Sequence, residues 1–214
     1  LARNGNAELL VNCTDNSQVI VPIGSSVVSN TGEARVTGHA ITNNGLIQGQ
    51  TNVKLLTDIL NNNAIIAAVN GDITVNPCSP GDPLSVTLIS GSQMNANNGN
   101  IRFSNINGGG TISVTGPGNV GTNPNGQISF GDGVTPNTVT MNVNQAVGAV
   151  SGVGTTTNVT TATGDLKVGP FDSTLAATFT ANGAGANITT AGNITAGGVL
   201  TLDAGSGNAN IVVN

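Results

Sequence analysis

The chain has 214 residues, enough for one large domain with a real core, and its formal net charge is −5. Charged residues make up only 7% of the sequence and the five Lys and Arg residues are scattered, so no basic patch is available to bind nucleic acid or anionic lipid. No apolar run approaches the 18 or so residues of a transmembrane helix, and we therefore expect neither nucleic-acid binding nor membrane insertion.

The composition favours an ordered β structure. Aromatic residues are only 2% of the chain, whereas Gly, Asn, Thr, Ser and Val are abundant. Disordered chains usually combine high net charge with few β-branched residues, and this chain shows the opposite pattern.

Longer apolar runs, such as residues 19–23 and 64–69, predict strands in the first 75 residues. One segment, residues 53–60, has apolar residues at Leu56, Ile59 and Leu60, which is a helical spacing. A single short helix or two strands around a turn would both fit it. The prolines of residues 76–83 then predict a loop.

From residue 71 onward a short phrase recurs, a Gly and a polar residue followed by an alternating apolar–polar stretch. Each copy reads as one turn and one short strand, and a single such strand cannot bury its apolar face alone. Many stacked copies bury a continuous core, and this stacking is what stabilises a solenoid. The gaps between copies are irregular. The copies begin at Gly71, Gly99, Gly110, Gly126, Gly164 and Gly192.

We therefore predict an all-β fold, a parallel β-helix that forms one elongated domain over residues 1–214. One coil of the helix would have three sides, each made of one strand and one tight turn, and would need about 16–22 residues. The chain would then form on the order of ten coils. Asn and Thr side chains are expected to form hydrogen-bonded ladders along the rod. An antiparallel β-sandwich is the alternative, favoured if the irregular gaps are hairpins. The apolar centres of the phrases should form the core: Ile73, Ile101, Ile112, Ile128, Leu166, Ile188 and Ile194.

The chain has two cysteines, Cys13 and Cys78. An even number of cysteines in a chain with an extracellular character predicts one disulfide. Two buried free thiols are the alternative.

The repeated phrase resembles the Gly- and Asn-rich repeats of filamentous haemagglutinin-like adhesins of Gram-negative bacteria, as in residues 42–49 and 192–198. Asn123, Pro124, Asn125 and Gly126, followed by the strand-like residues 127–131, are similar to the Asn-Pro-Asn-Gly motif in the secretion domain of two-partner secreted proteins. The resemblance implies a right-handed parallel β-helix and an extracellular or cell-surface location. The same four residues are also a strong turn sequence in any protein.

Residues for catalysis or metal binding do not cluster in the sequence. His39 is the only histidine, and with two distant cysteines it does not make a zinc site. Asp165 and Asp172 are the nearest approach to a carboxylate pair, with Lys167 between them. We therefore expect no enzyme activity, no catalytic residues, no metal and no cofactor.

The sequence favours a non-catalytic structural or adhesive segment of a secreted bacterial surface protein or filament. The expected partners are the chain itself or identical subunits, together with a glycan or protein of a host or cell surface. The alternative is a self-assembling extracellular fibre subunit whose terminal strands, residues 7–11 or 210–213, are donated to a neighbour. A polysaccharide-active enzyme is the third hypothesis.

Overall fold

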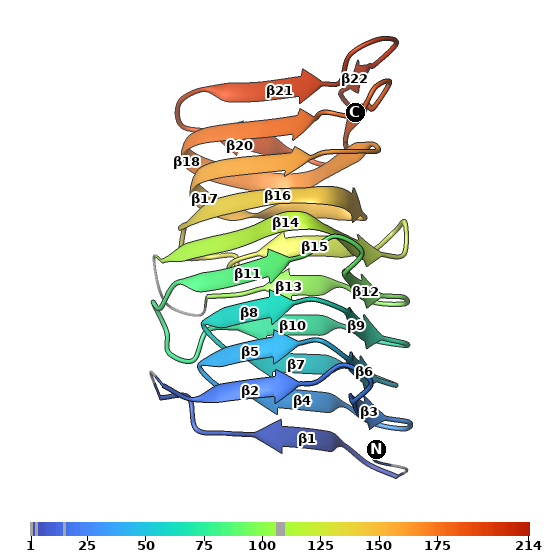
Figure 1. The fold of residues 1–214 in the computed structure, drawn as a ribbon. Helices are drawn as coiled ribbons and strands as arrows, with labels where there is room; N and C mark the ends of the chain where they lie inside the picture. Colours follow the sequence, from blue (N-terminus) through green and yellow to red (C-terminus); the bar gives the residue numbers. More distant parts are fainter. Residues whose placement is uncertain (1, 3, 15, 106–109) are drawn as a thin grey trace.

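The computed structural model describes residues 2, 4–14, 16–105 and 110–214. These residues form a parallel β-solenoid of about nine turns, and they contain no helix and hence none that could cross a membrane. Figure 1 shows the strands stacked along one axis, with the N-terminus at the lower end and the C-terminus at the upper end. Every strand pairing in this part of the chain is parallel. The predicted parallel β-helix is confirmed, and the antiparallel β-sandwich is wrong.

Each turn of the lower part places strands on three faces. The first face stacks β1 (Ala7–Leu10), β4 (Ala34–Thr37), β7 (Val53–Leu56), β10 (Ile73–Asn76), β13 (Ile101–Phe103) and β15 (Gln127–Phe130). The second face stacks β2 (Gln18–Val21), β5 (Ala40–Asn43), β8 (Ile59–Asn62), β11 (Leu84–Leu88) and the first parts of β14 (Thr111–Thr122) and β16 (Asn137–Val147). The third face stacks β3 (Ser26–Ser29), β6 (Leu46–Gly49), β9 (Ile65–Ala68), β12 (Gln93–Ala96) and the last parts of β14 and β16.

Above β16 the strands become longer and bend. β17 and β18 each begin on the first face, pass through shifts of register and end on the second face. The third face has no paired strand above β16 in the described part of the chain, so the cross-section of the rod changes along its length. The strands of this upper part are β17 (Ala149–Thr161), β18 (Leu166–Ala181), β19 (Ile188–Thr190), β20 (Ile194–Ala196), β21 (Leu200–Ala204) and β22 (Ile211–Val212).

Residues 53–60 form no helix. β7 ends at Leu56 and β8 begins at Ile59, so the alternative of two strands around a turn is confirmed. Val53 and Leu55 point inward and are buried, and β7 pairs with β4 below and β10 above. The strand alternation therefore prevails over the helical spacing because stacking satisfies the backbone of these residues on both sides.

The interior is the predicted Val, Ile and Leu core. Six of the seven predicted core residues are fully buried. Ile194 is only partly buried and packs against the core, because it lies in the last turn of the solenoid. Aligned residues on neighbouring turns are between 17 positions (Asn137 and Gly154) and 28 positions (Ile73 and Ile101) apart.

Asparagine side chains bond along the rod axis, as predicted. The Asn43 Nδ2 atom donates to Asn62 Oδ1 at 2.9 Å, and both residues are fully buried. The Asn62 Nδ2 atom in turn donates to the backbone oxygen of Gln93 on the next turn, at 3.0 Å. These contacts satisfy buried amides without any charge.

A second row follows the corner between the third and first faces. The Asn52 Oδ1 atom accepts the Asp72 amide at 2.9 Å, and Asp72 Oδ1 accepts the Asn100 amide at 2.8 Å. The Asn100 Oδ1 atom accepts the Gln127 amide at 2.9 Å. One polar side chain per turn therefore binds the backbone of the next turn.

Candidate functional site

A disulfide joins Cys13 and Cys78 across the corner between the first and second faces. Cys13 lies in the connection from β1 to β2, and Cys78 lies in the connection from β10 to β11, three turns higher. Both sulfur atoms lie beside the carbonyl oxygen of Leu56, in β7 on one of the two intervening turns, at 3.6 and 4.0 Å. The bond therefore runs along the rod and fastens the lowest turns to one another.

His39 and Asp58 lie beside this disulfide on neighbouring turns of the same corner. The His39 Nδ1 atom is 2.8 Å from Asp58 Oδ2, and the Asp58 Oδ1 atom accepts the Cys78 amide at 2.7 Å. Ser85 lines the same hollow of about 320 Å³. A Ser–His–Asp triad needs a serine hydroxyl bonded to the imidazole ring, and no such bond joins Ser85 to His39 in the described residues. Asp58 thus links the imidazole ring of His39 to the backbone of Cys78 at this corner, a contact that the sequence analysis missed.

The residues Asn123, Pro124, Asn125 and Gly126 form a tight turn between β14 and β15. The Gly126 amide donates to the Asn123 backbone oxygen at 2.9 Å, and the Asn125 amide donates to Asn123 Oδ1, also at 2.9 Å. A Cβ atom on Gly126 would lie 2.6 Å from the backbone oxygen of Gly99 on the turn below. The motif thus has the local structure that its turn chemistry predicts.

Asp165 and Asp172 have separate partners. Asp165 Oδ1 accepts the Asn187 amide at 2.8 Å, whereas Asp172 Oδ1 accepts the Thr195 hydroxyl at 2.5 Å. No group of three or more His, Cys, Asp or Glu side chains suited to a metal ion occurs among the described residues.

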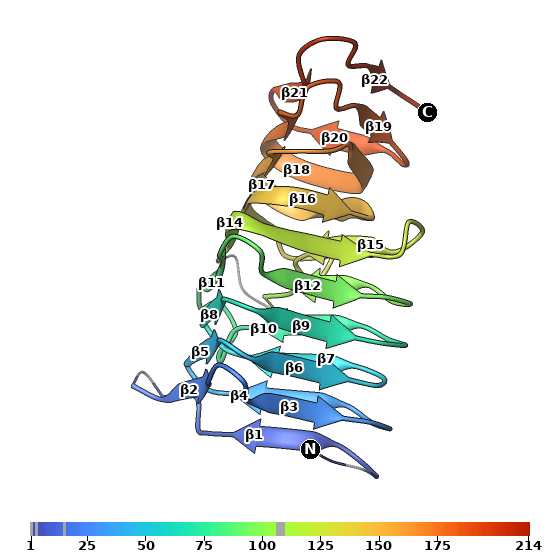
Figure 2. The same cartoon turned by 45° about the vertical axis from the view of Figure 1, so that its right-hand side comes forward.

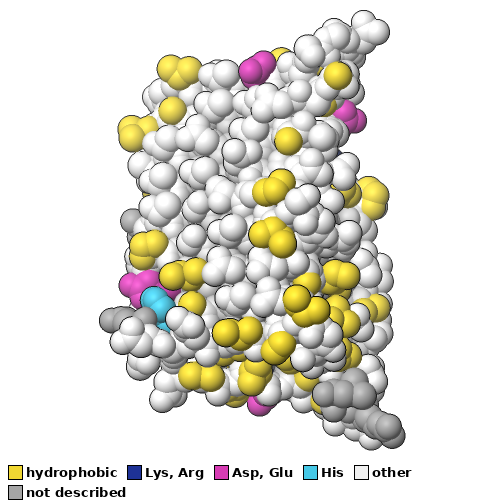
Figure 3. Space-filling model, viewed as in Figure 1, with side chains coloured by type: hydrophobic (Ala, Val, Ile, Leu, Met, Phe, Trp, Pro, Cys, Tyr) yellow, Lys and Arg dark blue, Asp and Glu magenta, His cyan; other side chains and the backbone are white. Residues whose placement is uncertain are grey.

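All described basic side chains belong to strands of the first face. The pairing places Arg35 beside Lys54, and Arg102 lies two turns higher in the same outward row; Lys167 lies on β18. In Figure 3, which looks onto other faces, no Lys or Arg side chain is visible, and apolar side chains gather over the lower half. The positive charge of the described rod is therefore confined to one side.

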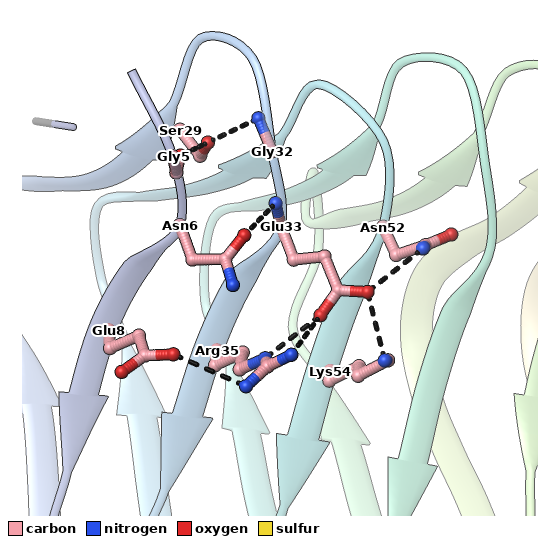
Figure 4. Close-up of polar contacts among 9 residues, drawn as sticks. All are labelled: Gly5, Asn6, Glu8, Ser29, Gly32, Glu33, Arg35, Asn52 and Lys54. Atoms are coloured by element: carbon pink, nitrogen blue, oxygen red, sulfur yellow. Dashed lines mark hydrogen bonds and ion pairs between the residues drawn. The ribbon is translucent and has the colours of Figure 1, made fainter. Parts of the chain in front are cut away.

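Glu33 is the centre of a charged network at the lower end of that face, shown in Figure 4. The Glu33 carboxylate binds Lys54 Nζ at 2.9 Å and Arg35 Nη2 at 2.8 Å, and it accepts a hydrogen bond from Asn52 at 3.2 Å. Arg35 also reaches Glu8 at 3.3 Å. The hydrogen bond from Lys54, opposed by burial and supported by Arg35 and Asn52, lowers the pKa of Glu33 from 4.5 to about 2. The charges of this network are thus mutually satisfied.

A groove of about 530 Å³ lies higher on the rod, where the first face meets the bend of β17 and β18. Arg102, Asp132 and Asp172 line it together with amide and hydroxyl side chains. Within the described residues no ion pair holds the Arg102 guanidinium. The groove therefore brings together one cation, two carboxylates and several neutral polar groups.

The upper end of the rod exposes residues of the core columns. Ile211 pairs directly above the fully buried Ile188, yet 45% of Ile211 is exposed. Leu202 pairs above the fully buried Phe179 and is only partly buried. Figures 1 and 2 show β21 and β22 at the upper end of the stack, with no described strand above them. Both the backbone edge and the apolar interior are open there.

In comparisons with known proteins, no family model matches the chain, and no curated protein or solved structure is significantly similar to it.

Proposed function

We propose that this chain is a non-catalytic, rod-forming segment of an extracellular surface protein, a segment that works by stacking and contact. The observation that carries the proposal is the open upper end. A parallel solenoid gains stability from each neighbouring turn, and an uncovered turn leaves unpaired backbone groups and apolar side chains in water. A further turn of the same kind is the occupant that matches both features.

The two ends of the rod favour continuation by a longer chain over a fibre of identical subunits. The lower end presents three strand-bearing faces, whereas the third face carries no paired strand in the described upper part. The upper end of one copy therefore does not match the lower end of the next. This mismatch disfavours the alternative of a self-assembling fibre subunit.

We assign the segment, as part of the same proposal, to the filamentous haemagglutinin-like secreted adhesins. The repeated turn-and-strand phrase and the tight turn at residues 123–126 support this assignment, which implies a right-handed coil and a cell-surface location. The separate partners of Asp165 and Asp172 support a non-catalytic role.

Adding one turn tests the proposal. Ile188 and Ile211 are aligned 23 positions apart, so a second copy of residues 188–210 inserted after Asn210 keeps the register. The inserted turn covers Ile194 and Leu202, and we therefore expect the midpoint of thermal unfolding to rise. The control is the same insert with its copies of Ile188, Ile194 and Leu202 replaced by Ser, which should not raise the midpoint. An insert of the native sequence that raises the midpoint no more than the control insert does would contradict the proposal.

A further inference from the structure

The groove on the upper half of the first face arises from a change in the path of the chain. Below the groove, the first and second faces are joined by a loop between β15 and β16, and this loop includes Gly131 and Asp132. Above the groove, β17 and β18 each continue from the first face to the second as one strand, with bends at Gly152 and Pro170. A Cβ atom on Gly152 would lie 2.6 Å from the Phe130 oxygen, so the bend requires a glycine there. The floor of the groove is thus set by the packed backbone.

Two rows of polar side chains run along the groove parallel to the rod axis. Arg102, Ser129 and Ser151 are aligned on successive turns of the first face. Asp172 and Thr195 are aligned on the far side of the bend. Neighbouring turns are about 4.8 Å apart, and a pyranose ring in an extended oligosaccharide advances by a similar distance. The groove therefore repeats its polar groups at the period of such a chain.

The charges of the groove disfavour a polyanion. One guanidinium, that of Arg102, and two carboxylates, those of Asp132 and Asp172, line the groove. The remaining polar groups are neutral: Gln127 and Asn193 each provide amide donors and an acceptor, and Ser129 provides a hydroxyl, whereas Ser151 is largely buried. Sugar hydroxyls both donate and accept hydrogen bonds, so they match this mixture, whereas sulfate or uronate groups would meet two like charges.

The groove also offers apolar surface beside these polar groups. Pro170 is exposed and Val153 is partly exposed, and both line the groove. Phe130 and Phe171 line it but are nearly fully buried, so no aromatic ring lies open in it. The apolar contact available to a sugar ring is consequently aliphatic.

We propose that this groove binds a neutral oligosaccharide that lies along the rod axis across several turns. Arg102 and Asp172 are the residues that hold its hydroxyls from the two sides of the groove. The proposal rests on the adhesive part of the proposed function. It is independent of the open upper end, so a rod that binds no glycan would still pass the added-turn experiment.

Isothermal titration of the whole chain with defined oligosaccharides tests the proposal. The neutral probes are β-1,4-linked gluco-, manno- and xylo-oligosaccharides of two to six sugars, and the anionic probes are oligogalacturonates and heparin hexasaccharides. We expect at least one neutral series to bind, with affinity rising from the disaccharide to the hexasaccharide because the longer chain spans more turns. We expect the anionic probes to bind more weakly. Binding of none of the neutral series, or tighter binding of an anionic probe, would overturn the proposal.

Three variants locate the binding site. Arg102→Gln and Asp172→Asn should each weaken binding of the neutral hexasaccharide at least tenfold. Asp203→Asn makes the same charge change on the exposed outer side of β21, away from the groove, and should leave binding unchanged. An equal loss in Asp203→Asn would overturn the proposal. Asp172→Asn loses the contact with Thr195 and could unfold for that reason. In that case the binding measured for Arg102→Gln tests the site, because this change breaks no ion pair within the described residues.

Discussion

Phe179 and Leu202 occupy the same inward column on neighbouring turns, yet only Phe179 is fully buried. The difference has one cause, which is that a turn lies above Phe179 and none lies above Leu202 in the described structure. Ile188 and Ile211 repeat the relationship on the first face. In a solenoid the stability of each turn depends on its neighbours, so the last turn should be the least stable part of the rod.

Core truncation should therefore cost more in the middle of the rod than at its upper end. Ile128 is fully buried between Ile101 and Val150, and Ile128→Ala should lower the free energy of unfolding by about 2–5 kcal/mol. Ile194→Ala is the matched control, and its cost should be smaller because Ile194 is already partly exposed. Urea unfolding followed by circular dichroism measures both. A loss below about 0.5 kcal/mol for Ile128→Ala would mean that this residue does not face the core.

The disulfide should stabilise the lower turns chiefly by restricting the unfolded chain. Cys13 and Cys78 are 65 positions apart, and closing a loop of that length is worth about 4 kcal/mol on the chain-entropy model. The double variant Cys13→Ser/Cys78→Ser should therefore unfold at a lower urea concentration. A reducing agent should bring the native chain to the same midpoint and leave the double variant unchanged. Two free thiols in the denatured, unreduced protein would show that the bond does not form.

Acid should weaken the lower end of the first face through Glu33. The folded-state pKa of Glu33 is about 2 and its ordinary value is 4.5, so the unfolded chain takes up this proton first as the pH falls. The stabilising contribution is complete above pH 4.5 and is lost progressively between pH 4.5 and 2.

Glu33→Gln isolates this contribution. It should lower the thermal midpoint at pH 7 and reduce the steepness of the loss between pH 4.5 and 2. Asp203→Asn, a change at an exposed carboxylate, should preserve the pH dependence of the native chain. The same pH profile for Glu33→Gln and the native chain would rule out Glu33 as the source.

The sequence alone sufficed for the class of fold and for most of the core, because strand alternation and repeated turn residues are local signals. The order of the turns was harder to predict. Ile101 and Ile128 lie on the first face, whereas Ile112 and Val139 lie on the second, so the gaps measured between consecutive phrases mixed two faces. Sorted by face, both pairs have the same spacing of 27 positions.

A regular signal in the lower turns was also missed. Between residues 33 and 63, hydrogen-bonded or paired side chains recur at a separation of 19 positions, which is one turn. His39 with Asp58 and Asn43 with Asn62 are examples. A search for that period would have found the His39 and Asp58 pair. The groove has no comparable signal, because it depends on a bend at Gly152 that only the packing against Phe130 explains.

Sedimentation velocity over a range of concentrations is the most direct test of the central claim that the upper end is an open contact surface. In the absence of a further turn, we expect the native chain to associate by covering its upper end with that of another copy, and to form small oligomers because the two ends do not match. Leu202→Asp should abolish this association, since it places a charge on the open core column. Val134→Asp, which alters an exposed side chain in the connection between β15 and β16, should leave the association unchanged. A native chain that stays monomeric at every concentration, or that associates equally well as Leu202→Asp, would contradict the claim.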